Sequence, residues 1–193
     1  MKRLVVFAVL VGLLCGPGAV SADDEVEVLG VKLPKTKVVE GKTLTLNGVA
    51  YRTAALGFVK VYAVGFYLER PTRDAQEVIR SDQVKQLYFH YLTSKATAEK
   101  LRDGFIDLIK TCNPEELVER NQADIERYAS WLDKDMQPGL TSVSTYVPGK
   151  GLTLEYQGET RGTISNKEFI EMYYRYNFGE KANPDIRDGL LGK

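Results

Sequence analysis

The 193-residue chain carries 26 lysines and arginines against 26 aspartates and glutamates, so its net charge at pH 7 is zero. Balanced, mixed charge argues against a groove that binds nucleic acid or phosphate. One histidine and two cysteines are too few for a typical zinc site, and neither a GxxxxGK[ST] loop nor a GxGxxG fingerprint occurs, so we expect no metal and no cofactor.

Residues 1–22 have the three parts of a secretory signal: a basic start, an apolar run from Leu4 to Cys15, and small residues at Val20-Ser21-Ala22. The run is too short to span a bilayer, which takes about 20 residues. We therefore expect residues 1–22 to be removed and residues 23–193 to form a single domain, periplasmic or secreted, with a net charge of about −2. Cys112 would then be the one remaining thiol, so no internal disulfide is expected.

The first half of the domain is predicted to be mostly strands. Residues 26–53 are rich in Val, Leu and Thr and broken by turn residues, and Asn47-Gly48 favours a tight two-residue hairpin turn. Residues 58–68 are apolar on both parities, which is typical of a strand buried on both faces, and we place it in the middle of the sheet. A short helix is expected over 72–80 and another strand over 84–93.

A helical region and a second group of strands follow. Apolar residues over 95–112 recur at the three-and-four spacing of one helical face, and Asn113-Pro114 is expected to start the next helix. Alternation over 141–164 predicts a three-stranded meander with a turn at Gln157-Gly158. Ser165 to Glu168 fits a capping box that opens a helix, and a last short helix should start at 183–185. This α+β order predicts a mostly antiparallel sheet with helices on one face.

The one histidine of the chain and Cys112 are more simply explained as structural residues than as catalytic ones. His90 lies in mid-strand among aromatic residues, where a structural histidine is favoured over a general base. Cys112 lies on the apolar stripe of its helix, where a buried inert thiol is favoured over a nucleophile. We therefore name no catalytic residue.

Two segments carry a family resemblance. GVAYR at 48–52 and FVKVYAVGFYLE at 58–69 resemble the signature region of the chalcone isomerase family, in which an arginine-bearing hairpin leads into a strand of the form F-V-K-F-x-x-I-G-x-Y-L-E. The helix at 95–112, GTISNKEF at 162–169 and LLG at 190–192 resemble the exported bacterial branch of that family. The implied fold is an open-faced β-sandwich, a large antiparallel sheet with helices packed on one face.

The plant enzymes of this family close a flavanone ring by adding a phenolate to an enone, and an arginine stabilises the anion. Arg52 matches that arginine. Tyr62 replaces the threonine of the enzymes' strand, and the helix at 95–112 contains neither the tyrosine nor the asparagine of the enzymes. An intramolecular lyase or isomerase acting on an enone or enol therefore stays as the alternative function. Tyr62, Tyr51 or Lys60 would be its only nearby acid or base.

Other family members bind fatty acids without catalysis, and they hold the carboxylate with an arginine and a tyrosine. Arg52 and Tyr62 are similar to that pair, with Lys60 and Tyr51 as further ligand-binding candidates. Lys60 and Tyr62 share one strand parity and should face the same side. The resemblance thus implies a binder of fatty acids or similar small apolar anions.

Two plainer interpretations remain open. Arg52 could be a surface residue or an ion-pair partner of Glu69 or Glu77, with Tyr62 a core residue. The eleven tyrosines could instead serve a protein interface, as in a structural or interaction protein. The sequence names no oligomeric state.

Overall fold

A computed structural model describes residues 24–193. The expected signal segment, with Cys15 and the cleavage site, lies outside the described residues. The strands are β1 (Glu25–Val28), β2 (Val31–Pro34), β3 (Thr36–Val39), β4 (Lys42–Ala54), β5 (Val59–Leu68), β6 (Lys85–Tyr91), β7 (Thr141–Val147), β8 (Gly151–Tyr156) and β9 (Glu159–Ile164). The helices are α1 (Ala75–Arg80), α2 (Ala98–Cys112), α3 (Glu115–Arg120), α4 (Gln122–Ser130), α5 (Lys167–Phe178) and α6 (Pro184–Leu190).

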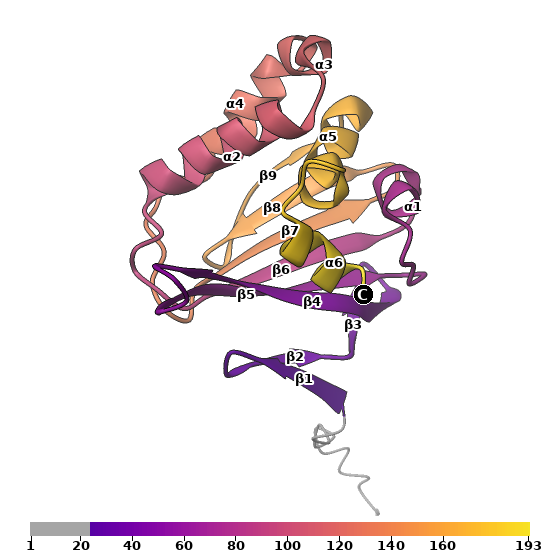
Figure 1. The fold of residues 1–193 in the computed structure, drawn as a ribbon. Helices are drawn as coiled ribbons and strands as arrows, with labels where there is room; N and C mark the ends of the chain where they lie inside the picture. The colour runs from indigo at the N-terminus through magenta and orange to yellow at the C-terminus, as the bar shows by residue number, and fades with distance from the viewer. Residues whose placement is uncertain (1–23) are drawn as a thin grey trace, which may run out of the picture.

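Strands β3 to β9 form one antiparallel sheet in which every strand pairs with its neighbour in the sequence. The helices lie on one face of this sheet, and the β1–β2 hairpin lies against the other face (Figure 1). The predicted α+β architecture, a large antiparallel sheet with helices on one face, is confirmed. β5 is an interior strand as expected, although β6 occupies the middle of the seven.

The main core fills the space between the sheet and the helices. Phe66 from β5, Leu87 from β6 and Leu154 from β8 meet Phe169 and Tyr174 from α5, and all five are fully buried. A smaller apolar cluster under the β1–β2 hairpin contains Val31, Leu33 and Ala63. β5 is therefore covered on both sides, which explains why its sequence is apolar on both parities.

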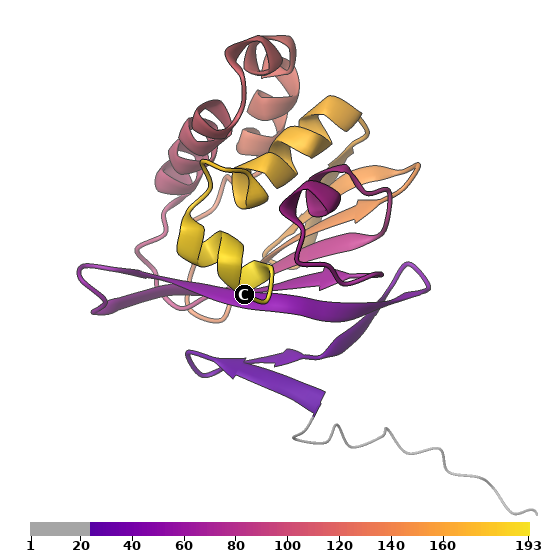
Figure 2. The ribbon, with the colours of Figure 1, turned by 45° about the vertical axis from the view of Figure 1, so that its right-hand side comes forward.

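The predicted turn at Asn47-Gly48 is wrong, because β4 runs straight through these two residues with an irregular register between Leu46 and Gly48. The Asn47 amide donates to the Leu190 carbonyl at 2.9 Å and its oxygen accepts from the Thr72 amide at 2.8 Å. A Cβ on Gly48 would lie 2.3 Å from the Gly189 carbonyl oxygen. Helix α6 lies across β4 (Figure 2) and packs against the Asn-Gly pair. The tight turns lie instead at Leu29-Gly30 and Glu40-Gly41.

Most of the other predicted elements form, with differences at their ends. The strand meander over 141–164 and its turn at Gln157-Gly158 are confirmed, and Asn183 caps α6. Asn166, not Ser165, caps α5 by accepting from the Glu168 amide at 3.1 Å. Asn113 is not an N-cap, because its amide donates to the Ile109 and Met172 carbonyls. The helix after Pro114 is divided into α3 and α4.

One charged side chain lies inside the core. Lys85 on β6 is 1% exposed, and its ammonium donates to the Val78 and Ser81 carbonyls at 2.8 and 2.9 Å, at the end of α1. The ammonium also lies over the rings of Tyr146 and Tyr174. Burial lowers the pKa of Lys85 to about 8 because a charged ammonium is poorly solvated there.

Candidate functional site

The candidate site is a cavity of about 710 Å³ between the sheet and the helices. β4, β5 and β6 form its floor, and α2 with α5 forms its roof. Its apolar lining comes from both layers: Val59, Val61, Phe89, Leu101, Phe105, Leu108 and Leu132. Its volume falls in the range of small-ligand sites, which are lined mostly by apolar side chains and orient the ligand with a few polar groups.

Arg52 and Tyr62 meet in this lining because they are paired across β4 and β5. Arg52 is exposed at the open end, whereas Tyr62 is largely buried and stacks edge-on against Phe89 and Tyr91 at centroid distances of 5.2 and 5.9 Å. A guanidinium at the mouth and a phenol further in can both donate hydrogen bonds to one anionic group.

Lys60 lies outside this cavity lining, so the shared face expected for Lys60 and Tyr62 is wrong. Thr53 pairs with Lys60 and Arg52 with Tyr62, which leaves Val61 as an extra residue in β5. This bulge reverses the parity, so Val59 and Val61 face the cavity and Lys60 does not.

Tyr51 also lies outside this cavity. It pairs with Ala63, which belongs to the cluster on the other face of the sheet, and it lines a second cavity beside α6 together with Arg52. The first cavity therefore contains Arg52 and Tyr62 but neither Tyr51 nor Lys60.

The alternative partners proposed for Arg52 are engaged elsewhere. Glu69 forms an ion pair with Lys42 at 3.4 Å, and Glu77 accepts from the Thr72 hydroxyl at 2.6 Å. Within residues 24–193, no carboxylate forms an ion pair with Arg52. Its guanidinium is thus free to take an anion from solution.

Four more phenols line the cavity: Tyr91, Tyr128, Tyr173 and Tyr176. Burial raises the pKa of Tyr62 and of Tyr176, and the positive charge of Arg52 acts in the opposite direction on both. Both phenols are therefore protonated at neutral pH and act as hydrogen-bond donors. Tyr128 is held by a 2.8 Å hydrogen bond with Ser144.

Sequence reasoning missed Tyr176, Lys95 and Lys100 as lining residues. Tyr176 follows Tyr173 by three positions on α5, and that helical spacing could have placed the two on one face. No sequence signal pointed to Lys95, because it lies in the connection between β6 and α2, whose path depends on the fold.

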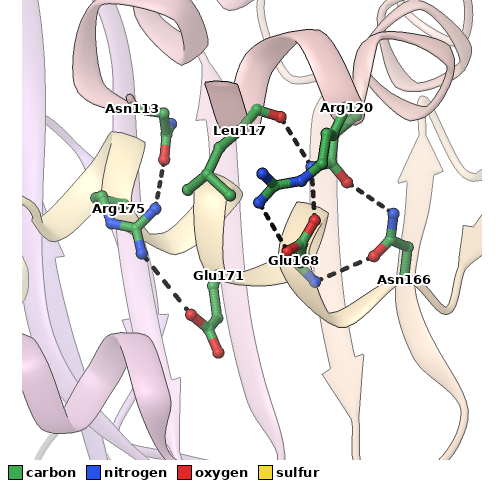
Figure 3. A network of polar contacts seen from close by, with 8 residues as sticks. Asn113, Leu117, Arg120, Asn166, Glu168, Glu171 and Arg175 are labelled. Carbon is green, nitrogen blue, oxygen red and sulfur yellow. Dashed lines mark hydrogen bonds and ion pairs between the residues drawn. The ribbon is translucent and has the colours of Figure 1, made fainter. Parts of the chain in front are cut away.

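A polar network connects α5 to α3 and to the C-terminal end of α2, the other helix of the roof (Figure 3). Glu168 accepts from Arg120 and from Asn121, each at 3.1 Å, and Asn166 donates to the Asn121 oxygen at 2.7 Å. Arg175 donates to the Asn113 oxygen at 2.7 Å. The residues of α5 and its cap thus hold both ends of α3, and with it the helices that cover the site.

Neither His90 nor Cys112 lines the cavity. Burial raises the pKa of the Cys112 thiol, which therefore stays protonated and unreactive at neutral pH. Across residues 24–193, no three histidine, cysteine or acidic side chains form a group that could hold a metal ion. In that same part of the chain, no helix has the length and apolarity to cross a membrane.

Known proteins share this architecture. A family model described as chalcone isomerase-like matches residues 25–192. The structure is similar to the crystal structure of a fatty-acid binding protein from Arabidopsis thaliana, with a TM-score of 0.70 and 16% sequence identity, over 87% of this chain and 96% of that chain. A search of curated proteins found no match.

Proposed function

The chain belongs to the chalcone isomerase-like family, and on that premise we propose that it is a non-catalytic binder of fatty acids or similar small apolar anions, exported to the periplasm or secreted. One observation carries the proposal: Arg52 and Tyr62, paired across two strands, line one end of a largely apolar cavity. The similar plant structure is that of a fatty-acid binding protein, which supports the same ligand class.

The chemistry of the cavity suits a carboxylate with an apolar tail. A guanidinium presents a fixed fork of donors, which matches the two oxygens of a carboxylate, and such charge-assisted bonds are stronger than neutral ones. The protonated phenol of Tyr62 adds a donor without adding charge. The tail would lie along the aliphatic and aromatic side chains between the sheet and α2.

Export rests on residues 1–22, which have the order of charge, apolar run and small residues that signal peptidases recognise. Recovery of the protein with a mature N-terminus far from Asp23, or with residues 1–22 intact, would contradict this part of the proposal.

The binding experiment compares the unmodified protein with Arg52→Ala. We expect Arg52→Ala to weaken fatty-acid binding by roughly 10- to 100-fold, because it removes a charge-assisted pair of hydrogen bonds. Isothermal titration with a soluble medium-chain fatty acid measures the affinity. Arg73→Ala is the matched control, because Arg73 is exposed before α1 and outside the cavity.

Native mass spectrometry of the purified protein supplies the second measurement. Absence of bound lipid, together with no binding of titrated fatty acids, would refute the proposal. Turnover of a chalcone that is lost in Arg52→Ala would instead support the isomerase alternative, with the protonated Tyr62 as its acid.

A further inference from the structure

The turn between β4 and β5 exposes two large apolar side chains. Leu56 is 99% exposed and Phe58 is 89% exposed. The hairpin that carries them projects past the helices and the other strands, at the left of Figure 2. Single exposed apolar residues are ordinary, but two together at a projecting tip mark a contact surface.

The backbone of the turn holds these side chains outward. Ala55, Leu56 and Gly57 have φ values of 50°, 55° and 93°, a left-handed conformation that costs energy for the first two. The Gly57 amide donates to the Ala54 carbonyl and the Phe58 amide to the Ala55 carbonyl, each at 3.2 Å. The tip is therefore a defined turn. Its two apolar side chains are not buried by the rest of the described chain.

The tip lies at the mouth of the cavity. Ala54, Ala55 and Val59, which flank the exposed pair, line the cavity. The charged residues of the same lining are Arg52, Lys95 and Lys100 against the one acid Asp107. Two apolar side chains therefore project beside an opening with an excess of positive charge.

We propose that this tip, Leu56 and Phe58 with the cationic mouth behind it, docks the protein on an anionic lipid bilayer. Apolar side chains at a tip enter the interface between headgroups and acyl chains, while nearby lysines and arginines are attracted to anionic headgroups. A second copy of the chain fits less well, because two side chains give far less area than a stable dimer needs and the two cationic mouths would repel each other.

Docking would place the cavity mouth against the membrane, where an apolar ligand could pass between bilayer and protein. This use of the tip rests on the proposed function, whereas docking itself does not. If fatty acids fail to bind and vesicle binding persists, the first proposal alone is refuted.

Vesicle flotation tests the docking. The probes are vesicles of phosphatidylcholine alone and vesicles of phosphatidylcholine with phosphatidylglycerol in equal parts. We expect the unmodified protein to float with the anionic vesicles and to bind less at high salt. The double variant L56S/F58S should bind them roughly tenfold more weakly. V38S is the matched control, because Val38 is 76% exposed on β3, at the opposite end of β4.

Circular dichroism and ligand affinity show whether the double variant is intact. Loss of vesicle binding with an unchanged fold, and with V38S binding normally, supports the proposal. Equal vesicle binding by L56S/F58S overturns it, as does the absence of vesicle binding by the unmodified protein. A dimer that L56S/F58S dissociates, without any vesicle binding, would assign the tip to a second copy and would also overturn it.

Discussion

Helix α6 comes very close to the sheet at Gly48. A Cβ at this position would lie 2.3 Å from the Gly189 carbonyl oxygen and 2.5 Å from that of Leu190, and both are backbone atoms. Neither atom can move without displacing α6. We expect Gly48→Ala to lower the free energy of unfolding by about 1–3 kcal/mol or more, measured by urea denaturation.

Gly104→Ala is the control for this prediction. Gly104 lies within α2, where an added Cβ meets nothing within 4 Å. Alanine is a better helix former than glycine, so this change should raise the free energy of unfolding by about 0.5–1 kcal/mol. Equal effects of the two substitutions would show that close contact with α6 does not determine the choice of glycine at position 48.

The residue scale also shows where prediction from sequence fails. Arg52 and Tyr62 could be predicted to meet, because the motif places them on adjacent paired strands. Lys60 could not be placed correctly, because the extra residue Val61 changes the parity of β5 and nothing in the local sequence marks it. Asn47-Gly48 has strong turn propensity, but contacts with Thr72 and Leu190 override it.

At the scale of elements, the contact of α3 with α5 depends on Asn121. Its amide donates to the Leu117 carbonyl at 2.8 Å and to Glu168, and its oxygen accepts from Asn166. Asn121→Ala should lower the free energy of unfolding by about 2 kcal/mol, because the buried Asn121 side chain loses three hydrogen bonds. Thermal and urea unfolding measure the change.

Gln122→Ala is the matched control, because the Gln122 side chain makes one exposed hydrogen bond to Glu126 on its own helix. Its effect should stay within about 0.5 kcal/mol. If Asn121→Ala is no more destabilising than Gln122→Ala, the network of Figure 3 does not fix the roof of the cavity.

The order of the elements could be predicted well, because period-2 and period-3.6 patterns depend on local sequence. Strands β5 to β9 and helices α1, α2, α5 and α6 form where the pattern placed them. The ends were less predictable, as at α5, where Asn166 rather than Ser165 takes the cap. Several residues near a helix start can cap it, and packing decides among them.

At the scale of the whole molecule, buried tyrosines and lysines give stability a distinct pH dependence. Burial lowers the pKa of Lys85 and of Lys37 to about 8, below the unfolded value of 10.5. Between these values the unfolded chain binds more protons, so stability rises with pH. Burial raises the pKa of ten of the eleven tyrosines, so above about pH 10 the folded chain binds more protons and stability falls.

We therefore expect the urea midpoint to rise modestly from about pH 8 to about pH 10 and then to fall steeply. Each fully buried phenol removes roughly 1.4 kcal/mol for each pH unit above its unfolded pKa. Phenolate absorbance should appear together with unfolding rather than before it. Lys85→Met should make the rise of the urea midpoint between about pH 8 and about pH 10 smaller, because one of the two lysines that cause it is gone. A midpoint that declines steadily from pH 8 would contradict the predicted effect of the buried lysines.

The bond between Asn47 and Leu190 joins positions that are 143 residues apart. Bringing together residues so far apart in the sequence costs conformational entropy, and this cost falls once the strands and helices between them have folded. Without α6, Asn47 and Gly48 of the strand that carries Arg52 would lose the helix that packs against them. The position of the strand that carries Arg52 therefore depends on contacts made by the last helix of the described residues.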